Sequence, residues 1–109
     1  MQVHPGVFVS NVTPQDWDDD PEVPGSQFHV LVDSAGVQAG LTRFLQDPGP
    51  TPWTPEVREV VVILEGSVRI EIAGGPTLAL GVGDMATLAA GTETTWHVTT
   101  PFKEVWFLA

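Results

Sequence analysis

The chain has 109 residues, 42% of them hydrophobic, and carries fourteen acidic against four basic side chains, for a net charge of −10 at neutral pH. This length allows one globular domain with a core of its own. The absence of cysteine excludes disulfide bonds and thiolate metal sites. The four basic residues are scattered, so neither nucleic acid nor an anionic membrane surface is an expected partner.

The first 27 residues are rich in proline, aspartate and glycine and contain only short apolar stretches. The opening MQVHPGVFVSNV lacks the basic segment and long apolar segment of a secretory signal, so we expect a cytoplasmic protein. The acidic stretch DWDDDPE at 16–22 lacks the alternate spacing, central glycine and closing glutamate of a calcium loop. Residues 1–27 are therefore predicted to form an irregular arm that packs on a barrel of residues 28–109.

Short runs of β-type residues fill the rest of the chain, and no segment has a helical period beyond a few residues. Glycine and proline residues, among them Gly66 and Pro101, separate these runs and predict turns. We predict strands near 28–33, 38–46, 58–64, 67–73, 77–81, 85–88, 94–99 and 102–108, with an additional one at 6–10. Many short strands at this spacing are typical of an all-β sandwich or barrel.

The stretch EVVVIL at 59–64 is apolar on both faces of its predicted strand. Alternation places Glu59, Val61 and Ile63 on one face and the other three residues on the opposite face. The first face would line the barrel, and an apolar outer face must also be covered. Either the N-terminal arm covers it or a second copy of the chain does, so a homodimer is one of two equal expectations.

Three stretches together resemble the cupin superfamily: EVVVILEGSVRI, GVGDMATLAAGTETTWHV and the closing KEVWFL. Glu59 with Gly66 is similar to the end of the first cupin motif, and Gly83, Asp84 and Gly91 are similar to the second. The resemblance covers roughly residues 38–108 and is greatest to the small single-domain branch of ureidoglycine aminohydrolases and ethanolamine-utilisation cupins. It implies a jelly-roll β-barrel, or double-stranded β-helix, with a small-molecule or metal site in its open mouth.

The metal site that the resemblance implies is incomplete here. Metal-binding cupins use three histidines and a glutamate, and the histidine places fall at Trp53, Pro55 and Thr94, so that only Glu59 remains. A transition metal needs at least three protein ligands. His97 is the nearest substitute, but alternation with Trp96 turns it outward. We therefore expect no cofactor, and the alternative is a divalent metal held with Glu59 and His97.

Glu59 would lie among apolar side chains, where burial raises the pKa of a carboxyl unless a donor such as Arg43 or Thr94 is close. It could act as a general acid or base, or be an inert former ligand. Glu104 lies in a last strand that is apolar on both faces. We expect it to point outward. The alternative is that it shares the pocket with Glu59, and then one carboxyl would hold a proton at neutral pH.

The predicted pocket combines this carboxylate with indole side chains that could sandwich a flat or cationic molecule. The expected function is binding of a small polar or aromatic metabolite in the barrel mouth. The alternatives are a cupin enzyme that depends on a metal or on Glu59, and a structural homodimer whose pocket is filled by its own side chains. The pocket residues are Trp53, Pro55, Glu59, Val61, Thr94 and Trp96.

Overall fold

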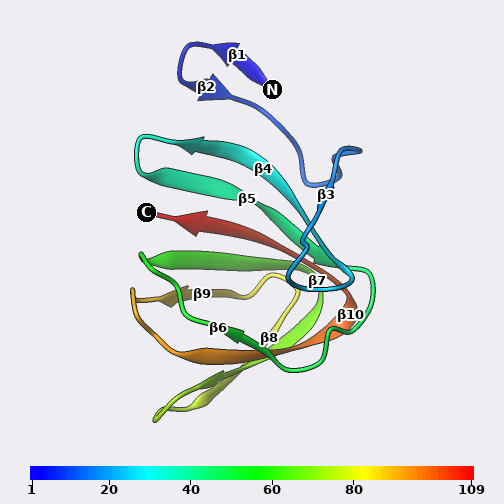
Figure 1. Cartoon of the computed structure of the whole chain (residues 1–109), viewed down its shortest axis with the longest axis vertical. Helices are drawn as coiled ribbons and strands as arrows, with labels where there is room; N and C mark the ends of the chain where they lie inside the picture. The colour runs from blue at the N-terminus through cyan, green and yellow to red at the C-terminus, as the bar shows by residue number, and fades with distance from the viewer.

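The computed structural model describes all residues from 1 to 109, and every regular element in it is a β-strand (Figure 1). The all-β prediction is confirmed. None of the chain forms a helix with the length and apolar character that a membrane crossing requires. The strands are β1 (Gln2–His4), β2 (Val7–Phe8), β3 (Asp18–Asp19), β4 (Ser26–Ser34), β5 (Val37–Phe44), β6 (Thr51–Trp53), β7 (Glu59–Ile72), β8 (Thr77–Gly81), β9 (Met85–Leu88) and β10 (Thr94–Leu108).

Two layers of antiparallel strands face each other, and β7 and β10 belong to both (Figure 1). In the first layer the order is β3-β4-β5-β10-β7-β9, where β10 contributes residues 103–108 and β7 residues 59–65. In the second layer the order is β6-β10-β7-β8, with residues 94–99 of β10 and 67–72 of β7. The two longest strands therefore bend from one layer into the other.

The turns predicted at Gly66 and Pro101 are wrong, because each lies inside a continuous strand. The predicted strands 58–64 and 67–73 are one strand, β7, and the predicted strands 94–99 and 102–108 are one strand, β10. The register between them is irregular from Thr99 to Glu104, where the strands bend. Gly66 has a φ of 75°, and a Cβ there would collide with the carbonyl oxygens of Thr99 and Pro101. Glycine is required because the backbones approach closely at the bend.

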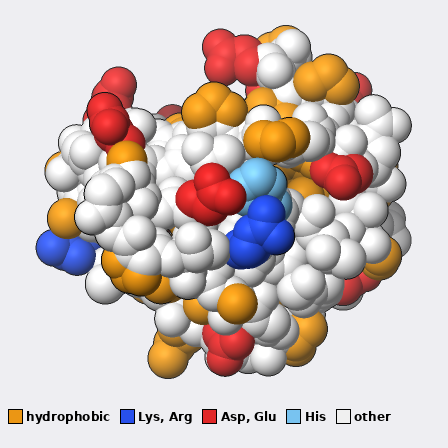
Figure 2. All heavy atoms as spheres, turned by 90° about the horizontal axis from the view of Figure 1, so that it is seen from below, with side chains coloured by type: hydrophobic (Ala, Val, Ile, Leu, Met, Phe, Trp, Pro, Cys, Tyr) orange, Lys and Arg blue, Asp and Glu red, His pale blue; other side chains and the backbone are white.

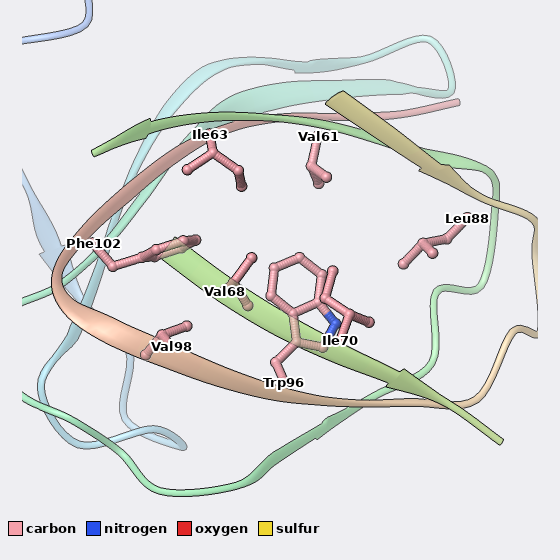
Figure 3. Close-up of a cluster of buried hydrophobic side chains, with 8 residues drawn as sticks. All are labelled: Val61, Ile63, Val68, Ile70, Leu88, Trp96, Val98 and Phe102. Carbon is pink, nitrogen blue, oxygen red and sulfur yellow. The ribbon is translucent and has the colours of Figure 1, made fainter. Parts of the chain in front are cut away.

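The hydrophobic core lies between the two layers. Figure 3 shows eight side chains pointing inward from β7, β9 and β10 to fill the barrel. They follow the predicted alternation, since Val61, Ile63, Val68 and Ile70 are each at most 3% exposed. The remaining members of the cluster are Leu88, Trp96, Val98 and Phe102.

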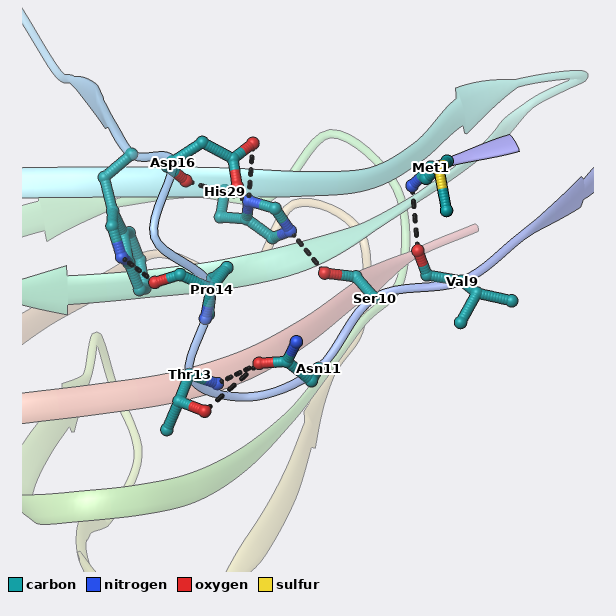
Figure 4. Close-up of polar contacts among 9 residues, drawn as sticks. Met1, Val9, Ser10, Asn11, Thr13, Pro14, Asp16 and His29 are labelled. Carbon is teal, nitrogen blue, oxygen red and sulfur yellow. Dashed lines mark hydrogen bonds and ion pairs between the residues drawn. The ribbon is translucent and has the colours of Figure 1, made fainter. Parts of the chain in front are cut away.

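Residues of the N-terminal segment lie against the outer face of the first layer (Figure 4). Both ring nitrogens of His29, in β4, form hydrogen bonds with the N-terminal segment. Nε2 lies 2.7 Å from Ser10 Oγ, and Nδ1 lies 3.0 Å from the Asp16 carbonyl oxygen. The Arg43 guanidinium lies 4.1 Å from the centre of the Trp17 ring, a cation–π contact. These contacts fix residues 10–17 over β4 and β5.

Part of the same outer face is not covered by the arm. Val60, Met85 and Phe107 point outward from neighbouring strands of the first layer and are 37%, 72% and 43% exposed. We call these three residues the outer patch. The arm therefore covers the part of this face near β4 and β5, and the part near β7 and β9 stays open.

Candidate functional site

Glu59 begins β7 and points into the barrel, where it is only 5% exposed. Leu88 of β9 and Leu108 of β10 lie opposite it in the two adjacent strands, so its neighbours are largely apolar. Its side-chain donor is Trp53, whose indole Nε1–H donates to Oε1 at 2.8 Å. Neither Arg43 nor Thr94, the donors expected from the sequence, makes this contact. Burial raises the pKa of Glu59, and the Trp53 hydrogen bond partly opposes that rise.

Glu104 also points into the barrel, so the expectation that it faces solvent is wrong. It is 7% exposed, and its Oε2 is buried without a hydrogen-bond partner. The alternation of β10 continues unchanged through its bend, so Glu104 shares the inner face with Phe102 and lies opposite Thr42 and Ile63. Burial and, to a smaller extent, the nearby Glu59 carboxylate raise the pKa of Glu104 well above its usual range. The two carboxyls lie in one pocket and raise each other's proton affinity, as expected for neighbouring like charges.

The indole side chains on the inner faces of the strands are fixed by hydrogen bonds. Trp106 follows Glu104 by two residues on the inner face of β10 and donates to Thr42 Oγ1 at 2.9 Å. Trp96 donates to Thr94 Oγ1 at 3.0 Å, and the Thr94 hydroxyl donates to the Trp53 carbonyl oxygen at 2.5 Å. Each buried indole N–H therefore has a partner, as buried polar groups require.

The mouth of the barrel holds a cavity of about 350 Å³. The Trp53 side chain lines this cavity and also donates a hydrogen bond to Glu59, so it links the cavity to that buried carboxyl. The cavity lining is partly apolar and includes the exposed acidic residues Asp33 and Glu56. The other lining residues are Gly36, Val37, Gln38, Thr54, Val57 and Leu108.

The structure therefore distributes the predicted pocket residues over different depths. Among them Trp53 alone lines the cavity, whereas Glu59, Thr94 and Trp96 are buried and joined to it directly or through one another by hydrogen bonds. Val61 and Pro55 are fully buried, and the Pro55 carbonyl oxygen accepts the Gly91 amide at 2.8 Å. Sequence reasoning missed Thr42 and Trp106. Glu104 was predicted to point outward, which is wrong. A predicted strand with two apolar faces does not indicate which of its residues point inward.

The donors present do not fit the metal that the cupin resemblance implies. No group of three or more His, Cys, Asp or Glu side chains is placed to hold a metal ion. His97 lies on the outer face of the second layer, as alternation predicts, with Nε2 3.1 Å from Glu71 Oε1 in an ion-pair arrangement. Figure 2 shows a histidine with a basic and an acidic side chain in a hollow on this side of the molecule. His97 therefore cannot complete a site with Glu59 inside the barrel.

Comparison with known proteins gives a consistent family. A family model described as the EutQ-like cupin domain matches residues 38–106. No curated protein sequence matches the chain. KdgF from Halomonas sp. is similar in structure, with 21% identity, a TM-score of 0.70 and 86% of each chain covered.

Two further solved structures have the same fold. An RmlC-like cupin from Shewanella frigidimarina has 12% identity and a TM-score of 0.74 over 93% of this chain and 91% of its own. An EutQ protein from Salmonella typhimurium has 23% identity and a TM-score of 0.62 over 76% and 68%. These identities support the fold alone, and the predicted jelly roll is confirmed. Since the family model spans more than half of the sequence, the chain belongs to the EutQ-like cupin domain family.

Proposed function

We propose that this protein binds a small organic molecule in the mouth of its barrel without a complete metal site. The observation that supports this function best is the cavity of about 350 Å³ lined by Trp53, whose indole N–H bonds the buried Glu59. Ligand sites in proteins are typically concave, mostly apolar and supplied with a few polar groups that orient the ligand. The mouth has each of these features.

The carboxyl pair adds the chemistry of such a site. Both pKa values are raised by burial, and perturbed carboxyls inside a cleft are common at functional sites. A pair that holds a proton can donate to a ligand acceptor with one carboxyl and accept from a ligand donor with the other. A polar or aromatic metabolite that places its ring against Trp53 and its polar end toward Glu59 fits this arrangement.

Closing the mouth should abolish binding. We expect Val57→Trp, which adds a large side chain at the cavity wall, to remove the binding of small molecules selected by ligand-detected NMR from a set of cationic, neutral and anionic compounds. The matched control is Val82→Trp, because Val82 is 68% exposed and lies outside the cavity. Failure of every class of compound to bind the wild-type protein, or equal binding by Val57→Trp, would contradict the proposed function.

We also propose that the protein self-associates through the outer patch. Val60, Met85 and Phe107 are apolar, exposed and adjacent, and no arm residue covers them. An uncovered apolar surface of this kind is a common feature of subunit interfaces, and a twofold arrangement would cover two copies at once.

Sedimentation velocity tests this association. We expect the wild-type protein to sediment as a dimer at tens of micromolar, and Phe107→Glu to sediment as a monomer because a charge at the interface would lose its hydration. Val82→Glu adds the same charge outside the patch and should remain dimeric. A wild-type monomer at this concentration would rule out the dimer.

A further inference from the structure

We propose that the ligand of the mouth is an organic cation with N–H donors, in the simplest case a primary ammonium, bound with its charge directed at Glu59 and Glu104. This inference rests on the proposed function and specifies its ligand class. The ring or chain of the ligand would occupy the cavity against Trp53 and Val57, and its cationic end would reach Glu59 when the Trp53 ring, which bonds that carboxyl, turns aside.

The first support is the lack of hydrogen-bond donors around the two carboxyls. Oε2 of Glu104 is buried and accepts no hydrogen bond, and the side-chain donor to Glu59 is the Trp53 N–H alone. Buried polar atoms almost always have partners, so an unpartnered oxygen requires an explanation. An ammonium group carries three N–H donors and no acceptor, and it can therefore supply more than one of the missing bonds.

The second support is that the protein supplies no cation of its own to the barrel. All four basic side chains are placed elsewhere, and none of them lines the mouth cavity. A buried carboxylate without a positive partner is unfavourable, and a bound cation removes that penalty. The four basic side chains have other partners: Arg43 contacts Gln27, Arg58 contacts Thr87, Arg69 lies near Glu71, and Lys103 donates to the Val12 carbonyl oxygen.

The third support is the combination of aromatic and acidic groups along the entry route. Asp33 and Glu56 are exposed residues of the cavity lining, so an approaching cation is attracted before it reaches the indole of Trp53. Indole faces attract cations more strongly than other aromatic rings do. An anion would be repelled at each of these steps, and a neutral ring would leave the inner carboxyls without a positive partner.

Trp53 would act as the positioning residue at the entrance. Its N–H donates to the Oε1 atom of Glu59, and its ring forms part of the cavity wall. A ligand N–H can replace the indole N–H as donor when this half-exposed ring turns aside. A bound cation also favours the ionised form of both carboxyls, so the proton shared by the pair is released to solvent.

Isothermal titration calorimetry with benzylammonium and its neutral counterpart benzyl alcohol tests this ligand class at neutral pH. We expect the wild-type protein to bind benzylammonium at least about tenfold more tightly than benzyl alcohol. Titrations in two buffers of different ionisation enthalpy should show proton release with the cation and none with the alcohol. Glu104→Gln and Glu59→Gln should both reduce the preference for the cation, and Glu104→Gln should also remove the proton release.

The control is Glu22→Gln, which removes one exposed charge from the arm and leaves the barrel unchanged. It should retain the preference, whereas a nonspecific attraction to the acidic protein would weaken equally in all three variants. Equal affinity for cation and alcohol, or an unchanged preference in Glu104→Gln, would overturn the ligand class. The mouth would remain a binding site in that case if Val57→Trp still abolished binding. If neither compound bound the wild-type protein, this inference would fail, whereas the proposed function would fail only if no compound of the wider set bound.

Discussion

Leu88→Ala is expected to lower the free energy of unfolding by about 2–5 kcal/mol. Leu88 is 3% exposed and belongs to the core between the layers, opposite Glu59. Removal of its three outer carbon atoms loses their burial and leaves a cavity that the surrounding strands close only in part. Since a domain of this kind has a total stability of about 5–15 kcal/mol, this loss would be a large fraction of it.

Urea denaturation of Leu88→Ala and Leu45→Ala provides the measurement. Leu45 undergoes the same chemical change but is 60% exposed, so its loss should stay within about 0.5 kcal/mol. Similar losses in the two variants would contradict the core described here. A parallel decrease in the unfolding temperature of Leu88→Ala alone would support it.

Glu104→Gln is expected to remove a decrease in stability that the wild-type protein shows as the pH rises. Burial raises the pKa of Glu104 well above its unfolded value of 4.5, so the folded state holds a proton that the unfolded state releases. Stability therefore falls with pH from this unfolded value up to the folded pKa, by at most about 1.4 kcal/mol per pH unit for one proton. Below the unfolded pKa both states hold the proton, and this contribution is constant.

The measurement is the difference between the urea unfolding curves of wild type and Glu104→Gln at a series of pH values from about 5 to about 8. Glutamine has nearly the same volume but does not ionise, so the difference isolates one group from the other acids of the chain. Glu22→Gln serves as the control, because an exposed charge should shift the curve without changing its slope. Parallel curves for wild type and Glu104→Gln would mean that Glu104 titrates normally.

The fold was largely predictable, because alternation is a local property of the sequence. The inward direction of Val61, Ile63, Val68 and Ile70 and the outward direction of His97 follow from a period of two. The bends at Gly66 and Pro101 were not predictable in this way, because glycine and proline occur both at turns between strands and at bends within one strand. Only the tertiary contact between the two bent strands distinguishes these structures.

The candidate site was predictable only in part. Glu59 was identified through its motif position, and Trp53 through its place in the loop before it, but the hydrogen bond between them depends on the paths of β6 and β7. Glu104 was assigned to the wrong face because a separate strand at 102–108 would be apolar on both faces and gives no parity signal. The continuous strand β10 keeps the inward parity of Val98 and Phe102 as far as Glu104. Whether two predicted strands are separate or continuous therefore decides which face a charged group occupies.

The passage of β7 and β10 from one layer into the other links the mouth to the stability of the entire domain. Glu59 belongs to the first layer and the Trp53 strand to the second, so the two groups meet only when both layers are assembled. Neither layer can melt on its own, because each would lose two strands that continue into the other. A ligand bound in the mouth would therefore raise the free energy of unfolding of the entire domain, rather than stabilise a local loop alone.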